Sequence, residues 1–165
     1  MPSDLTSKLK KYYVSTNRSG LLLSGALALL MVCTTVKSTA SGGEDGKLPP
    51  CPASPNCVGS DATDAAHRVE PYRLRVAPGE GWQALLEVVA ALPRTTVVTK
   101  SEDYLHVESR SALFGFVDDV EFRLRPADKT IAVRSASRLG YWDLGVNRRR
   151  VEQIRELLRA RGVVG

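Results

Sequence analysis

The sequence predicts an α+β fold, a two-layer sandwich in which two helices cover an antiparallel sheet of about five strands. The chain has 165 residues, of which 43% are apolar and 25% charged, as in an ordinary globular protein with one core. Its periodic segments occur in the order strand, helix, four strands, helix. Strands joined by short turns are antiparallel, and helices with a single apolar stripe need a sheet face to cover.

The first two elements are a strand and a helix. Apolar residues alternate with arginines from Tyr72 to Val76, which indicates a half-buried strand that ends at Pro78-Gly79. Apolar residues then recur at three- and four-residue intervals from Trp82 to Leu92, and Pro93 stops the pattern. This spacing predicts an amphipathic helix.

Four strands and a second helix follow. Asp103 and Pro126 to Lys129 supply the turn residues of two hairpins. The last helix is expected to start at Asp143 or Asn147. The strands are predicted at Thr95–Lys100, Tyr104–Ser109, Phe114–Arg125 and Thr130–Ser137. The helix has an apolar stripe of Val151, Ile154, Leu157 and Leu158, with Arg148, Arg149, Arg155 and Arg159 mostly outward.

Residues 1–40 have the layout of an export signal. Basic residues precede an uncharged apolar run, Leu21 to Val36, and small residues end at Ala40, after which cleavage is expected. Because the run is shorter than the roughly 20 residues that span a bilayer, a cleaved signal is favoured over a retained membrane segment. Cys33 resembles a lipoprotein acceptor, but Met31 and Val32 before it fit such a site poorly. The chain is therefore expected in the periplasm or attached to a membrane, with any membrane association through residues 21–36.

The net charge of +5 is concentrated at the N-terminus. Residues 1–40 carry five basic residues and one acidic residue, so the remainder has 18 basic and 17 acidic residues. A nearly neutral domain without clustered basic residues argues against nucleic-acid binding. No other partner is indicated.

Residues 41–68 are predicted to form a Pro/Gly-rich linker and a loop, followed by a single domain at 69–165. Five residues separate Cys51 from Cys57, and an oxidising compartment favours a disulfide between them. Two cysteines with only His67 and His106 are an incomplete ligand set for structural zinc. We expect neither a metal nor a cofactor.

Asp118 breaks the pattern of its strand. It falls on the same face as Phe116, Val120 and Phe122, where a carboxylate needs a partner or a proton. The other face carries Val117, Asp119, Glu121, Arg123 and Arg125 and is expected to face solvent. If the turn pairs Arg125 with Thr130, Glu121 lies opposite Arg134 and Asp118 opposite Ser137.

These charges have two interpretations. Asp118, Asp119 and Glu121, with Arg134 and Arg138, form either a cross-strand ion-pair ladder or a site in which an arginine binds a carboxylate or phosphate ligand. The following segment carries further polar side chains. Asp143 and Asn147 are candidate caps of the helix, and Ser135 and Ser137 have no histidine adjacent in sequence for a hydrolytic dyad.

Three blocks of the sequence resemble a known family. The signature blocks of the uncharacterised family called domain of unknown function 1499 are similar to Cys51 to Val58, to Phe116 to Phe122, and to Arg134 to Arg138 with Gly140-Tyr141 and Asp143 to Arg148. The resemblance spans about Cys51 to Leu158, and Trp142 departs from it, because the family often has a small polar residue there. No activity, ligand or partner is assigned to that family. Because it also occurs in plastid-bearing organisms, a plastid lumen is an alternative location. The resemblance marks the candidate ligand-binding residues Asp118, Asp119, Glu121, Arg134, Ser135, Ser137, Arg138, Asp143, Asn147 and Arg148.

Three functional hypotheses follow. The first is an exported or envelope-associated, non-enzymatic binding or accessory module that uses the polar Asp/Glu/Arg site. The second is a small hydrolase or transferase with Asp118 as general base, which requires a cleft that exposes this carboxylate. The third is a wholly structural charge cluster.

Overall fold

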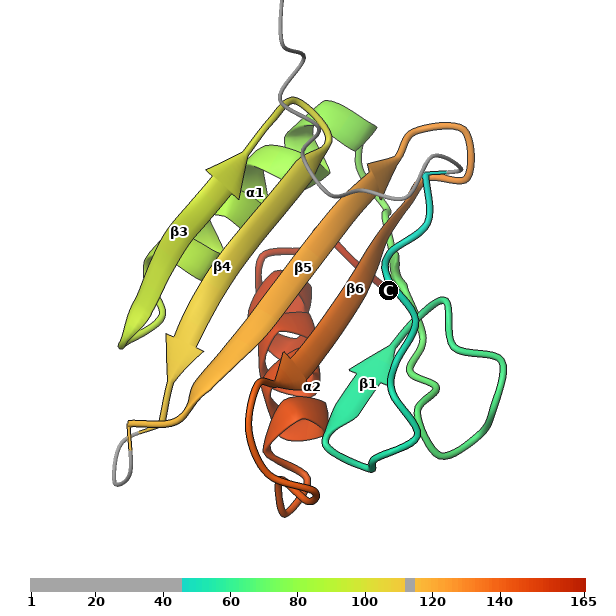
Figure 1. Ribbon diagram of the computed structural model, residues 1–165. Helices are drawn as coiled ribbons and strands as arrows, with labels where there is room; N and C mark the ends of the chain where they lie inside the picture. Colours follow the sequence, from blue (N-terminus) through green and yellow to red (C-terminus); the bar gives the residue numbers. More distant parts are fainter. Residues whose placement is uncertain (1–45, 112–114) are drawn as a thin grey trace, which may run out of the picture. The chain divides into compact units, whose positions relative to one another are not determined.

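The computed structural model describes residues 46–111 and 115–165. The predicted export signal, Cys33 and Phe114 lie outside these residues. The described chain forms a two-layer α+β sandwich, as predicted (Figure 1).

One layer is a six-stranded antiparallel sheet. Its order is β1-β6-β5-β4-β3, with β2 pairing to another part of β6. The hairpin turns place consecutive strands β3 to β6 side by side. The strands are β1 (Cys57–Gly59), β2 (Tyr72–Arg73), β3 (Thr95–Lys100), β4 (Tyr104–Arg110), β5 (Val117–Arg125) and β6 (Thr130–Ser137).

The other layer consists of two helices that cover one face of the sheet (Figure 1). Helix α1 (Pro78–Ala90) begins with a proline, whose missing N–H costs nothing in a first turn. Helix α2 is Val146–Ala160. Between the layers lies the core, whose largest fully buried side chains include Tyr72, Leu85, Phe122, Ile131, Ile154 and Leu158.

The hairpin register is confirmed. Arg125 pairs with Thr130, Glu121 with Arg134, and Asp118 with Ser137. Strand β5 begins at Val117, later than predicted, and Phe116 is exposed before it. The strand expected from Tyr72 to Val76 is reduced to β2, and Leu74 makes only an isolated bridge with Val164.

Two predictions for helix α2 are wrong. Leu157, assigned to the apolar stripe, is 40% exposed. Arg155, expected to point outward, is buried and stacks on the Tyr72 ring, 4.8 Å from its centroid. Its guanidinium donates hydrogen bonds to the carbonyls of Glu70 and Pro71, which satisfies the buried charge.

The face of the sheet opposite the helices is partly covered by the chain that precedes β1. Leu48, Tyr104 and Ala132 are buried together there. Glu121, expected to face solvent, is consequently buried as well. We call this the outer face and the helix-covered side the inner face.

Candidate functional site

The structure divides the candidate residues between the two faces of the sheet. Successive side chains of a strand point to opposite faces, so Asp118 lies on the inner face and its neighbour Asp119 on the outer face. The charges predicted at one end of the hairpin therefore belong to two separate networks.

Asp118 is the buried acid of the inner network. It is 4% exposed, and its carboxylate accepts a hydrogen bond of 2.6 Å from Arg150 of α2. Arg150 also donates to the Ser135 hydroxyl at 3.0 Å and to the Asn147 carbonyl oxygen at 2.8 Å. The partner that a buried carboxylate requires is thus a helix residue.

Asn147 is the centre of the same network. Its side-chain oxygen accepts from Ser135 at 2.6 Å, and its amide nitrogen donates to the Ser137 hydroxyl at 2.9 Å and to the Asn56 carbonyl at 2.9 Å. Asp143 accepts from the backbone N–H of Gly145 and Asn147, which satisfies donors of the first turn of α2. Asp143 therefore caps the helix, and Asn147 is buried and bonded.

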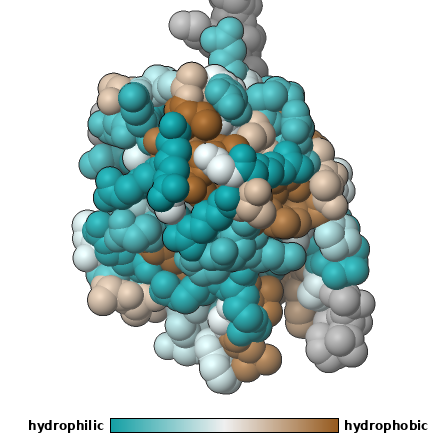
Figure 2. All heavy atoms as spheres, turned by 180° about the vertical axis from the view of Figure 1, so that it is seen from behind, coloured by the Kyte–Doolittle hydropathy of each residue, from teal (hydrophilic) through white to brown (hydrophobic). Residues whose placement is uncertain are grey.

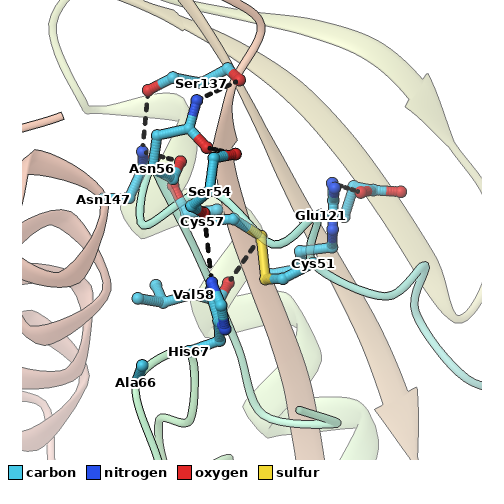
Figure 3. The surroundings of a disulfide bond; sticks show 12 residues. Cys51, Ser54, Asn56, Cys57, Val58, Ala66, His67, Glu121, Ser137 and Asn147 are labelled. Atoms are coloured by element: carbon cyan, nitrogen blue, oxygen red, sulfur yellow. Dashed lines mark hydrogen bonds and ion pairs between the residues drawn. A yellow bond between two sulfur atoms is a disulfide. The ribbon is translucent and has the colours of Figure 1, made fainter. Parts of the chain in front are cut away.

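A disulfide joins Cys51 and Cys57 and closes the loop that presents Asn56 (Figure 3). The side-chain amide of Asn56 donates to the Gly140 carbonyl at 2.6 Å. The backbone carbonyl of Asn56 accepts from the Ser137 N–H at 3.0 Å. The loop thereby ties β1 to the end of β6 and to the chain that leads into α2.

Arg138 is the centre of the outer network. Its guanidinium donates two hydrogen bonds to Asp119, of 2.7 and 2.9 Å, and one of 2.8 Å to Glu108. His106 lies 2.7 Å from the same Asp119 carboxylate. Burial acts to raise the pKa of Asp119, but the hydrogen bonds from Arg138 and His106 outweigh it and hold this pKa below its usual value.

Glu121 and Arg134 form a second pair on the outer face, with an Nη1–Oε2 distance of 2.7 Å. The Tyr104 hydroxyl donates to Glu121 at 2.8 Å. Burial and this hydrogen bond to a carboxylate both raise the pKa of Tyr104. Ser135 and His106 lie on opposite faces of the sheet and form no dyad.

Arg148 lies apart from both networks. Its guanidinium donates to the backbone carbonyls of Ala66 and Arg68, at 2.8 Å each. It ties the loop after β1 to α2. The candidate carboxylates thus have their partners within the domain. This indicates that both networks contribute to the stability of the fold.

A groove of about 330 Å³ lies beside the inner network. It is bounded by the loop between α1 and β3, the end of β4 and the first turns of α2. Its charged lining consists of four arginines, Arg94, Arg110, Arg149 and Arg150, with hydroxyls from Thr95, Ser109 and Ser111.

Among the described residues, no carboxylate lines this groove. Arg150 is neutralised by Asp118, and Arg110 lies 3.2 Å from Glu108. Arg94 and Arg149 make no ion pair within residues 46–111 and 115–165; each donates to a backbone carbonyl instead. Two guanidinium charges are therefore uncompensated there.

Two other cavities have carboxylates as well as arginines in their lining. The first, beside Arg148 and Arg155, also has Glu70 and Glu152 in its lining. The second, beside Arg123 and Arg125, includes Asp103 and Asp128. Their mixed charges give them less preference for an anion.

Sequence reasoning missed this groove, because it draws on three segments that are distant in sequence. One signal was available for Arg150. It lies three residues after Asn147 and four before Ile154, so helical periodicity places it on the buried stripe of α2. Arg94 and Arg110 carried no such signal.

No group of three or more potential metal ligands occurs among the described residues. Within the same part of the chain, none of the helices has the length and apolar character needed to cross a membrane.

The fold and site define a small, disulfide-containing α+β domain with an arginine-lined groove. The family model described as "Protein of unknown function (DUF1499)" matches residues 47–158. The chain belongs to this family. No curated protein and no solved structure matches the chain.

Proposed function

We propose that the protein is an exported, non-enzymatic binding module whose polar site is the arginine groove. The observation that carries this proposal is the pair of uncompensated guanidiniums, Arg94 and Arg149, in a groove that no carboxylate of the described residues lines. Guanidinium groups bind carboxylate and phosphate oxygens through paired hydrogen bonds. The ligand group is accordingly a phosphate or a carboxylate.

The predicted Asp/Glu/Arg cluster supports the groove rather than lining it. Asp118 and Ser135 hold Arg150, and Arg150 forms part of the groove wall. A fixed arginine loses less side-chain entropy when a ligand binds. In this proposal Asp118 is a positioning residue.

Two observations support export. The Cys51–Cys57 disulfide is typical of oxidising compartments outside the cytoplasm. The basic and apolar composition of residues 1–40 is typical of an export signal.

The geometry gives no support to a general base. Asp118 is buried and bonded to Arg150, and it lines none of the three cavities described above. A substrate would have to displace that ion pair to reach its carboxylate.

Calorimetric titration with inorganic phosphate and with acetate tests the proposal. The protein is produced in an exporting host and titrated in chloride buffer at constant ionic strength. We expect saturable binding of at least one anion, weakened about tenfold by Arg94→Gln or Arg149→Gln, because a hydrogen bond to a charged group contributes about 1.5–3 kcal/mol.

Lys100→Gln is the matched control. It removes the same charge at the far end of β3 from Thr95, which lines the groove. Binding that is absent, or that falls equally in the control, would show that the groove is not an anion site.

A further inference from the structure

The loop between β6 and α2 displays large apolar side chains to solvent. Leu139, Tyr141, Trp142 and Leu144 are 70%, 74%, 67% and 64% exposed. Single exposed apolar residues are common on protein surfaces, but four within six residues are a marked concentration and indicate an interaction surface. We call residues 139–144 the apolar loop.

The apolar loop lies at one end of the domain. Figure 1 draws it below the first turn of α2, and Figure 2 shows brown and pale surface at the same lower end of the molecule, seen from behind. The backbone N–H of Arg138 donates to the carbonyl of Val117. The loop therefore starts beside the first residue of β5, and Phe116 just before that strand is also exposed.

The loop backbone is held so that these side chains do not pack onto the core. The Gly140 carbonyl accepts from Asn56 at 2.6 Å, and the Leu144 carbonyl accepts from Arg149 at 2.8 Å. Leu144 has a φ of 56°, a left-handed conformation that favours Gly or Asn. A leucine in this conformation is less stable than a glycine would be, and the Leu144 side chain is nevertheless mostly exposed to solvent.

Two arginines follow the loop in the sequence. Arg148 and Arg149 are exposed there, whereas Arg138 before the loop is paired with Asp119 and Glu108, and the one carboxylate within the loop, Asp143, is engaged with the first turn of α2. Arg148 and Arg149 make no ion pair within the described residues. Apolar side chains beside uncompensated arginines complement an anionic lipid surface, where Trp and Tyr rings favour the headgroup level.

We propose that the apolar loop inserts into the headgroup region of an anionic lipid bilayer and docks the domain on the membrane. The charge of the neighbouring arginines Arg148 and Arg149 and the Trp and Tyr rings of the loop favour this occupant. Docking places Val146 and Arg149, which line the groove, next to the lipid surface. The proposal stands on the loop alone and does not require that the groove binds an anion.

Tryptophan fluorescence of the full chain with lipid vesicles tests this proposal. The chain has two tryptophans; Trp82 is buried in the core, whereas Trp142 lies in the loop. In a Trp82→Phe variant, vesicles of phosphatidylcholine and phosphatidylglycerol should shift the Trp142 emission to the blue, and brominated acyl chains should quench it. This readout reports the loop itself, whichever other segment touches the vesicle.

Two variants provide the comparison. Leu139→Ser combined with Leu144→Asn should reduce the quenching at a given lipid concentration at least about tenfold, because two apolar side chains that would insert into the bilayer are lost. Asn tolerates the φ of Leu144, so the loop backbone is kept. Val97→Ser with Val98→Ser removes exposed apolar residues of β3 and should leave the quenching unchanged. If Trp82→Phe fails to fold, the wild type gives the same comparison, since a core tryptophan is shielded from lipid.

Emission that neither shifts nor is quenched with anionic vesicles would overturn the proposal, and the loop would then serve a protein partner. Quenching that persists in the Leu139→Ser/Leu144→Asn variant would also overturn it. Arg94→Gln should leave the quenching largely intact even if it abolishes anion binding, so the two proposals fail separately.

Discussion

Asp118 is a buried carboxylate whose counter-charge is Arg150 of α2. It is 4% exposed and lies on the same strand face as the buried Val120 and Phe122, and its carboxylate is compensated by Arg150. Removing one partner of such a pair leaves the other charge buried and uncompensated.

Asp118→Asn should therefore lower the free energy of unfolding by about 3–5 kcal/mol, because the Arg150 charge loses its counter-charge. The urea midpoint at neutral pH measures this change. Combining Asp118→Asn with Arg150→Gln should recover part of the loss, since no orphan charge remains. An unchanged or raised midpoint would instead be typical of a carboxylate retained for activity.

At the level of elements, the N-terminal loop and β1 hold the polar networks together. The disulfide restrains the loop that positions Asn56 against the end of β6 and the start of α2. Closing a loop of this length in the unfolded chain contributes about 2 kcal/mol in the chain-entropy description.

A Cys51→Ala/Cys57→Ala variant should lose about 2 kcal/mol of unfolding free energy for this reason. Thermal unfolding with and without reductant measures the effect. Reductant should lower the midpoint of the wild type toward that of the variant and leave the variant unchanged. Equal midpoints for both proteins without reductant would contradict a stabilising disulfide.

Turn residues and the alternation of apolar residues along the chain were sufficient to predict the β5–β6 hairpin. The turn at Pro126–Lys129 set the register of β5 and β6, and the alternation along β5 identified Asp118 as anomalous. Strand β1 was missed because three residues are too few to show a period, and it is defined only by its pairing with β6.

The partners of the charged residues depend on packing and were harder to predict. Arg148, Arg149 and Arg150 are three consecutive arginines, but their partners differ. Arg148 bonds the loop after β1, Arg149 bonds the apolar loop and Arg150 pairs with Asp118. Arg155 was assigned outward because arginine is usually exposed, whereas the Tyr72 ring and two carbonyls stabilise it inside.

At the level of the whole molecule, one end of the sandwich carries both proposed surfaces. The groove and the apolar loop share the start of α2, through Val146 and Arg149. These two surfaces contain the exposed apolar residues Leu139, Tyr141, Trp142 and Leu144 and the arginines Arg94 and Arg149, which make no ion pair among the described residues. This arrangement favours a module that presents both surfaces to an anionic partner.

A crystal structure of the protein with inorganic phosphate tests the central claim most directly. The account predicts phosphate in the groove, with its oxygens at hydrogen-bond distance, about 2.7–3.2 Å, from the guanidiniums of Arg94 and Arg149. Phosphate bound only in the cavity beside Arg155 and Arg159, or bound nowhere on the domain, would contradict it.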